Sequence, residues 1–297
     1  MILLLKHFLS SGIDVVDIDE ALRRLRERTG SYFVVLTFDD GYLDNYTRVL
    51  PIFNGLGLPF TVFICSSIIE RTLDYWSGGL IELFMSHDEV EVEAMQMRFR
   101  LRNRRDREDA LSRVIRWVER DVTSRSLQLS STFQRYKISP GELLDQDAMT
   151  ADQLRTLAEN PLVTIGGHGF THQPLASLQE AEARREIVAN RRHLERITGR
   201  QVVHFSYPYG NTAACTWREA ELVRSAGFRS AFTTRIGNLF PQHSAFPFML
   251  PRGAMHPRRE EAYHAEAQFA GVHRFLKSRG GSPIHPDTLP PLGACAS

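Results

Sequence analysis

Five short apolar runs alternate with helical segments along the chain, and this order most restricts what it can fold into. The clearest run, 32–38, is apolar on both faces, as expected for a strand buried on both sides. The others are 59–64, 163–167, 202–206 and 230–234, and helices are expected at 13–28, 44–55, 151–159, 178–198 and 216–226. Strands separated by helices form right-handed βαβ units. The pattern predicts an α/β fold, either a barrel or a doubly wound sheet.

The alternation stops after residue 74 and returns after Thr150, so a helical insertion is expected at about 75–145. Residues 98–125 hold ten arginines against five acidic residues. Two interpretations are open: a patch for an anionic ligand, or the solvated face of helices. In the second, more ordinary interpretation the interspersed Asp106, Glu108 and Asp109 pair with the arginines.

Charge and cysteine content exclude several classes of protein. The 36 lysines and arginines nearly balance 35 acidic residues, which argues against nucleic-acid and membrane-surface binding. No apolar run approaches the roughly 20 residues of a membrane span, so no integral membrane segment is expected. The opening residues lack the features of a signal peptide, which predicts a cytoplasmic location. Cys65, Cys215 and Cys295 form no CxxC pair, which excludes a disulfide framework and a thiolate zinc site.

Polar residues stand where three of the expected strands end, the edge at which α/β folds place their sites. Asp39 and Asp40 follow the first run, and His168 and His172 follow the run 163–167. Each pair alone is ordinary loop chemistry. Together, carboxylates and imidazoles are a usual ligand set for a catalytic divalent ion. The third strand end is 205–210, where proline and glycine favour a tight turn.

These blocks resemble a known family. Thr37-Phe38-Asp39-Asp40-Gly41, His168-Gly169-Phe170-Thr171-His172 and Phe205-Ser206-Tyr207-Pro208-Tyr209-Gly210 are similar, in order and spacing, to the motifs of the polysaccharide deacetylases, carbohydrate esterase family 4. Leu250-Pro251-Arg252 is similar to a late strand of that family. The resemblance covers about 12–255 and implies a distorted (β/α) barrel with the helical insertion. Beyond it, a helical extension is expected at 256–279 and a disordered tail at 280–297.

The resemblance also implies roles for individual residues. Asp40, His168 and His172 would hold one divalent metal ion, zinc first and cobalt or nickel as alternatives. Asp39 would be the general base that takes a proton from water at the metal. The metal and the backbone N–H of Tyr209 would stabilise the oxyanion.

The stretch Tyr207, Pro208 and Tyr209 is expected to contact the substrate.

Two features depart from the family pattern. Many members carry arginine where Ser206 stands, paired there with the catalytic aspartate, and Arg252 is the candidate to orient Asp39 here. Many also carry a late Leu-x-x-His block that supplies the general acid, and none follows residue 210. His256 is a candidate for that general acid, and the more ordinary interpretation is that it lies in a surface loop.

The function implied is removal of an N-acetyl group from an amino sugar in a polysaccharide, oligosaccharide or lipid-linked glycan, with release of acetate. The partner expected is therefore an N-acetylated carbohydrate, with action at the cell envelope an option. Two alternatives stay open: another amide hydrolase such as a deformylase, and a carbohydrate-binding relative that has lost catalysis. The sequence leaves the oligomeric state undetermined.

Overall fold

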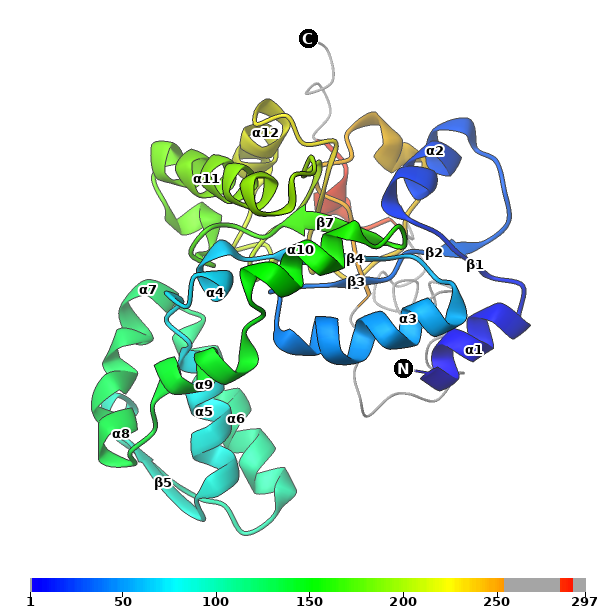
Figure 1. The fold of residues 1–297 in the computed structure, drawn as a ribbon. Helices are drawn as coiled ribbons and strands as arrows, with labels where there is room; N and C mark the ends of the chain where they lie inside the picture. Colours follow the sequence, from blue (N-terminus) through cyan, green and yellow to red (C-terminus); the bar gives the residue numbers. More distant parts are fainter. Residues whose placement is uncertain (1, 254–283, 291–297) are drawn as a thin grey trace. The chain divides into compact units, whose positions relative to one another are not determined.

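The computed structural model describes residues 2–253 and 284–290 and divides the chain into two compact units. One unit comprises Met1–Ser66 and Met149–Ser297, and the other is Ser67–Ala148 (Figure 1). The insertion expected at 75–145 lies inside the second unit.

The first unit is built on a curled parallel sheet of five strands in the order β3-β4-β7-β8-β9 (Figure 1). The strands are β3 (Thr37–Phe38), β4 (Phe60–Ile64), β7 (Val163–Gly167), β8 (His204–Ser206) and β9 (Ser230–Phe232). Beyond β9 an isolated parallel bridge joins Phe232 to Leu250. A separate parallel pair consists of β1 (Asp14–Val15) and β2 (Phe33–Val34). The fold is an α/β half-barrel, which confirms the α/β class that the alternation of strands and helices predicts.

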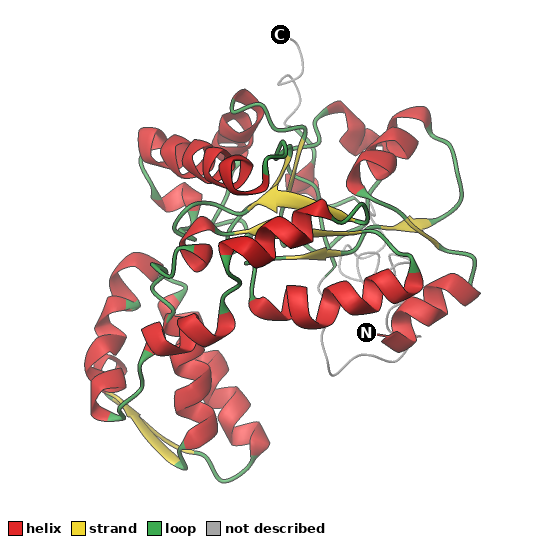
Figure 2. Ribbon diagram, in the orientation of Figure 1, coloured by secondary structure: helices red, strands yellow, loops and turns green. Residues whose placement is uncertain are grey.

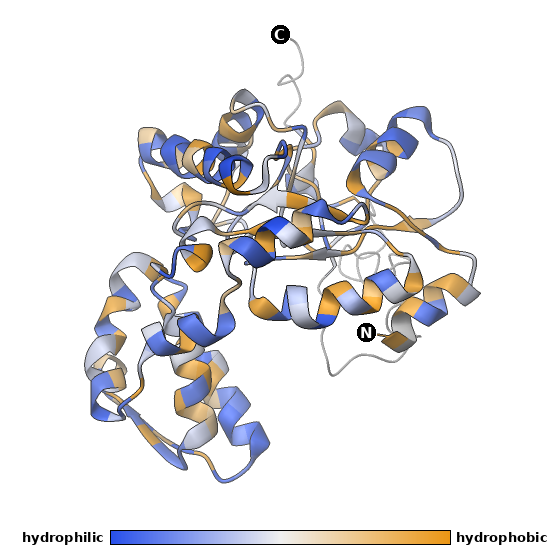
Figure 3. Cartoon of the chain, viewed as in Figure 1, coloured by the Kyte–Doolittle hydropathy of each residue, from blue (hydrophilic) through white to orange (hydrophobic). Residues whose placement is uncertain are grey.

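Helices flank this sheet (Figure 2). In the first unit they are α1 (Ile2–Ser10), α2 (Ile18–Glu27), α3 (Leu50–Leu56), α10 (Ala151–Glu159), α11 (Glu180–Thr198) and α12 (Trp217–Ser225). Helices α10 and α11 pack against β7, and α12 packs against β9. Hydrophobic and hydrophilic residues alternate along α11 (Figure 3), as expected for a helix with one buried face. Within the described residues, no helix is both long and apolar enough to cross a bilayer.

Strand β4 is buried on both faces, and phenylalanines anchor a core on each side. Phe63 lies with its ring centroid 5.6 Å from that of Phe232, in a cluster with Ile18, Leu22 and Leu250. On the other face, the Phe60 ring lies 4.7 Å from that of Phe53, which belongs to α3. Each buried phenylalanine contributes about 1.5–3 kcal/mol through the hydrophobic effect, so β4 is held firmly in place.

Two expected elements differ in the structure. The run 32–38 is not one strand, because β2 pairs with β1 whereas β3 pairs with β4. The run is also only partly covered, since Val34 is buried whereas Tyr32 is 89% exposed and residues 35–38 are half-buried, so burial on both faces is a wrong prediction for this run. The helix expected at 13–28 begins only at Ile18, where the Asp17 carboxylate accepts a hydrogen bond from the Glu20 N–H at 2.8 Å.

The second unit is mainly helical with one antiparallel hairpin. Its elements are α4 (Ser66–Ile69, which begins at the boundary), α5 (Trp76–Ser86), β5 (Glu89–Val92), β6 (Met97–Arg100), α6 (Arg104–Val118), α7 (Val122–Arg125), α8 (Ser130–Arg135) and α9 (Pro140–Asp147). Helix α5 packs against both α6 and α9.

Several arginines of this unit pair with nearby carboxylates, as the solvated-face interpretation predicts. Arg104 and Arg105 form i,i+4 pairs with Glu108 and Asp109. Asp106 instead accepts a hydrogen bond from the Arg102 N–H at the start of α6. The arginine-rich stretch therefore stabilises its own helix, and these contacts do not require an anionic ligand.

The expected helix at 256–279 lies outside the described residues. The disordered tail is a wrong prediction for residues 284–290, which include a 3-10 turn, η7 (Pro286–Thr288). Thr288 is fully buried, and its hydroxyl lies 3.0 Å from His243 Nε2. Arg235 donates to the Asp287 carbonyl. The proline-rich composition suggests disorder, but the contacts of Asp287 and Thr288 hold this segment in place.

Candidate active site

Polar residues from separate segments follow the carboxyl ends of parallel strands. Asp39 and Asp40 come after β3, His168 comes after β7, and Ser206 is the last residue of β8. Arg252 follows Leu250, the residue bridged to β9. Because carboxyl ends of parallel strands share one edge of a sheet, these residues meet there although up to 213 positions separate them.

The structure brings together the three residues expected to bind a metal. Asp40 Oδ1 lies 3.3 Å from His168 Nε2 and 3.2 Å from His172 Nε2. One donor atom from each residue lies within 4.8 Å of the other two. The His168 side chain is 2% exposed and that of His172 is 20% exposed, so the cluster is shielded but reachable.

This spacing fits a metal ion. Ligand atoms about 2.0–2.1 Å from a tetrahedral zinc ion are about 3.3–3.4 Å from one another, and the two Asp40–histidine distances are 3.3 Å and 3.2 Å. The set of two imidazoles and one carboxylate is also a donor set of catalytic zinc sites, which leave one coordination position open. These residues can hold a divalent ion with little movement.

The tautomer of His168 suits the same purpose. Its Nδ1 lies 2.7 Å from the carbonyl oxygen of Ser206, which can only accept a hydrogen bond. Nδ1 must therefore carry a proton and donate, so Nε2 is the ring nitrogen that faces Asp40; it has a free electron pair in the neutral imidazole and carries a second proton in the cation. Histidine ligands of metals are commonly oriented by such a hydrogen bond.

Arg252 forms a two-pronged ion pair with Asp39. Its Nη1 donates to Asp39 Oδ1 at 2.8 Å and its Nη2 to Oδ2 at 2.7 Å. Nη2 also donates to Ser206 Oγ at 2.8 Å, and Nε donates to the Thr233 carbonyl at 3.0 Å. The planar guanidinium is fixed by these contacts and holds both carboxylate oxygens. Arg252 thus lies where the expectation placed it, beside Asp39.

The charges of the site are coupled. Burial raises the pKa of Asp39, but the Arg252 guanidinium and His168 outweigh it and keep that pKa below its ordinary value. Burial likewise raises the pKa of Asp40, and hydrogen bonds from His168 and His172 bring it well below the usual range. Both carboxyl groups are therefore ionised at neutral pH, the form that a ligand or a base requires.

The site also concentrates unusual backbone. Among the described residues seven non-glycine positions have positive φ, and three of them are Asp40 (φ 77), His172 (φ 57) and Tyr209 (φ 63). Left-handed backbone costs a non-glycine residue about 1–3 kcal/mol, and such residues cluster at functional sites. Three strained residues in three loops at one sheet edge indicate that function selects this geometry.

The stretch expected to contact substrate is only partly available. Tyr207 is fully buried and its hydroxyl donates to the Phe248 carbonyl at 2.8 Å, so the prediction that its side chain contacts substrate is wrong. Pro208 is buried as well, whereas Tyr209 is half-buried with its ring 5.0 Å from that of His172. An aromatic residue at a strand end packs inward or outward according to backbone direction, which composition does not reveal.

Sequence reasoning did not single out Thr37 as part of the site, although its hydroxyl accepts a hydrogen bond from Arg252 Nη1 at 3.1 Å. The available signal is its spacing: Thr37 and Asp39 are two apart in an extended chain and share a face. His256, the guess for a general acid, lies outside the described residues.

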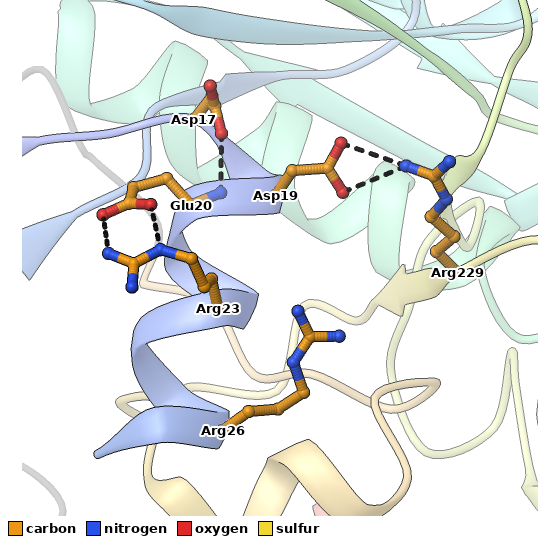
Figure 4. Close-up of a pocket in the computed structure, with 6 residues that line it drawn as sticks. All are labelled: Asp17, Asp19, Glu20, Arg23, Arg26 and Arg229. Carbon is orange, nitrogen blue, oxygen red and sulfur yellow. Dashed lines mark hydrogen bonds and ion pairs between the residues drawn. The ribbon is translucent and has the colours of Figure 1, made fainter. Parts of the chain in front are cut away.

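A surface pocket lies elsewhere in the unit, beside α2 (Figure 4). It is lined by Asp17, Asp19, Glu20, Arg23, Arg26 and Arg229. Ion pairs join Arg229 to Asp19 and Arg23 to Glu20. Behind it His204 Nε2 lies 3.5 Å from Asp19 Oδ1, at the end of β8 opposite Ser206. The pocket is therefore separate from the Asp40 cluster, and most of its charged side chains are already paired with one another.

Comparisons with solved structures agree with this fold. Among solved structures, IcaB from Ammonifex degensii superposes with a TM-score of 0.59 at 18% identity, covering 90% of this chain and 87% of that one. The Streptococcus pyogenes deacetylase PplD, in complex with acetate, gives 0.57 at 13% identity, covering 89% and 83%. The deacetylase domain of BpsB from Bordetella bronchiseptica gives 0.54 at 15% identity, covering 84% and 82%. At these identities the likeness shows a shared fold.

No curated protein sequence matches the chain. The family model described as polysaccharide deacetylase matches residues 26–230, more than half of the sequence. That match includes Asp39, Asp40, His168 and His172, and it confirms the family indicated by the motifs. The chain belongs to the polysaccharide deacetylase family.

Proposed function

We propose that this protein is a metal-dependent deacetylase that removes the N-acetyl group of an amino sugar in a polysaccharide, oligosaccharide or lipid-linked glycan and releases acetate. The observation that carries the proposal is the Asp40–His168–His172 cluster, with the ionised Asp39 next to it in the chain. Membership of the polysaccharide deacetylase family supports the carbohydrate substrate.

Asp40, His168 and His172 would hold the metal, with zinc as the first choice and cobalt or nickel as alternatives. A divalent ion at this position would polarise the acetamide carbonyl and acidify water. Asp39 would be the base that accepts a proton from water at this site, and Arg252 fixes the direction of its carboxylate. The Tyr209 backbone N–H is the proposed donor to the oxygen on which negative charge develops.

The arrangement around Asp39 bears on the alternative of a carbohydrate-binding relative without catalysis. Serine at 206 favours that alternative only if the catalytic aspartate lacks a cationic partner. Here Arg252 supplies the partner, and Ser206 Oγ accepts a hydrogen bond from the same guanidinium. We therefore infer that the departure at 206 relocates the arginine and leaves the chemistry in place. A deformylase-like hydrolase would use the same groups, so release of acetate or formate from matched substrates separates the two.

Metal analysis with aspartate variants tests the proposal. The wild type should contain about one divalent ion per chain, and His168→Ala/His172→Ala should contain none. Asp39→Asn should keep the metal and lose acetate release, whereas Asp40→Asn should weaken metal binding itself. Wild-type protein that stays empty after incubation with zinc, cobalt or nickel would contradict the proposal, as would equal turnover by wild type and Asp39→Asn.

A further inference from the structure

Two side chains on α11 hold the main chain of the loop that carries both histidines. Glu186 and Asn190 are four residues apart, so they lie on the same face of the helix. Neither has a role in the chemistry proposed above. Each forms several hydrogen bonds to the segment His168–His172 or to the neighbouring end of β4.

Glu186 holds the middle of the loop. Its Oε2 accepts from the Phe170 N–H at 2.9 Å and from the Thr171 N–H at 2.7 Å. Its Oε1 accepts from the Thr171 hydroxyl at 2.8 Å. One carboxylate therefore satisfies two consecutive backbone N–H groups and a side chain just before His172.

Asn190 holds the start of the loop. This residue is fully buried, and its Oδ1 accepts from the His168 N–H at 3.0 Å. Its Nδ2 donates to the Ile64 carbonyl at 3.0 Å and to Ser66 Oγ at 2.8 Å. An amide is needed because the oxygen must accept on one side while the nitrogen donates on the other.

The local sequence leaves room for these contacts. A Cβ atom at Gly167 would lie 2.6 Å from Asn190 Oδ1, and one at Gly169 would lie 3.7 Å from Glu186 Oε2. Gly167 must therefore lack a side chain for Asn190 to reach the loop. His172 has φ 57, a backbone conformation that a loop adopts only when its surroundings impose it.

We propose that Glu186 and Asn190 are positioning residues that set the loop 168–172 in its metal-binding shape before the metal arrives. The inference rests on the proposed function, because it assigns these hydrogen bonds a purpose in binding the divalent ion. The hydrogen bonds fix the main chain on either side of His168 and just before His172. Asp40 then faces two imidazoles that are already in place.

Glu186 gives the cleaner test, since Asn190 is buried and its replacement threatens folding. We would titrate metal-free wild type, Glu186→Ala and Glu186→Gln with zinc by calorimetry, with Glu221→Ala as the control. Glu221 is an exposed glutamate on α12 whose ion pair joins it to Arg224 of the same helix. Glutamine keeps one oxygen for the two backbone N–H groups, so it should restore what alanine loses.

Loss of a group that orients a metal ligand typically weakens metal binding about 10-fold to 100-fold, and we expect that loss for Glu186→Ala. Glu186→Gln and the control should stay within about threefold of wild type. Hydrogen exchange in the metal-free protein should be faster at the Phe170 and Thr171 amides in the alanine variant. This readout is independent of deacetylase activity.

Zinc affinity of Glu186→Ala within about threefold of wild type would overturn the inference. An equal loss in Glu186→Gln, with unchanged exchange at the two amides, would overturn it as well. Wild-type protein that binds no zinc would instead overturn the proposed function, and the two failures are therefore distinguishable.

Discussion

Replacing Arg252 by methionine should separate metal binding from turnover. Methionine keeps an aliphatic chain beside the Phe63 ring, over which the guanidinium carbon lies at 5.7 Å from the centroid. It removes both hydrogen bonds to Asp39, at 2.8 Å and 2.7 Å. The Asp39 carboxylate then stands next to Asp40 without the cation that orients it.

The size of the effect follows from those two bonds. A hydrogen bond to a charged group contributes about 1.5–3 kcal/mol, and the lower end applies because the Asp39 side chain is 28% exposed. Two such bonds favour the aligned carboxylate by about 3 kcal/mol, so without them the aligned form is up to roughly 100-fold less populated and the rate falls with it. We expect acetate release from an N-acetylated oligosaccharide to fall by about that factor, with the metal content unchanged.

Arg229→Met is the matched control, because Arg229 pairs with Asp19 on the surface and its side chain is 57% exposed. Exposed pairs contribute only about 0–1 kcal/mol, so this variant should behave as wild type. Turnover of Arg252→Met within about threefold of wild type would refute the reasoning that Arg252 orients the base. Loss of metal from Arg252→Met would equally refute the prediction that Arg252 acts in turnover and not in metal binding.

Three further outcomes are expected. Burial lowers the pKa of His243 to about 4, so between pH 6.5 and 4 the unfolded chain binds a proton that the folded chain does not. The free energy of unfolding should therefore fall by about 2–3 kcal/mol from pH 7 to 4.5. Urea unfolding should show less of this fall in His243→Gln. Tyr207→Phe should lose about 0.5–1.5 kcal/mol in thermal unfolding while zinc affinity stays unchanged, since its hydroxyl donates to the Phe248 carbonyl and, among the described residues, contacts no metal ligand. Tyr209→Ala should leave stability nearly unchanged and raise KM, because its half-buried ring lies 5.0 Å from the ring of His172, next to the proposed metal ligands.

The strand ends could be predicted from sequence because burial on both faces leaves a long apolar run, and polar residues after such a run stand out. Asp39, Asp40, His168 and His172 were found in this way, and family motifs then supplied their roles. The division of 32–38 between two sheets could not be predicted, since pairing depends on β1 and β4, which are distant from each other in sequence. The direction of Tyr207 was missed for the same reason, as backbone geometry decides which aromatic ring points inward.

Residues that act through hydrogen bonds across the fold leave the weakest signal. Glu186 and Asn190 lie in a helix that carries many other polar residues, and nothing in their spacing distinguishes them from those neighbours. Only the distances to Phe170, Thr171 and His168 show what they contact.

The ion pair of Arg252 and Asp39 also affects how the sheet is held together. Asp39 follows β3, the first strand in the order of the five-stranded sheet, and Arg252 follows the segment bridged to β9, the last. The pair therefore joins the two margins of an open sheet, between which no backbone ladder runs in the part of the chain that the structure describes. In this half-barrel the carboxylate that would accept the proton also joins the two margins of the sheet, so catalytic alignment and sheet geometry share one contact.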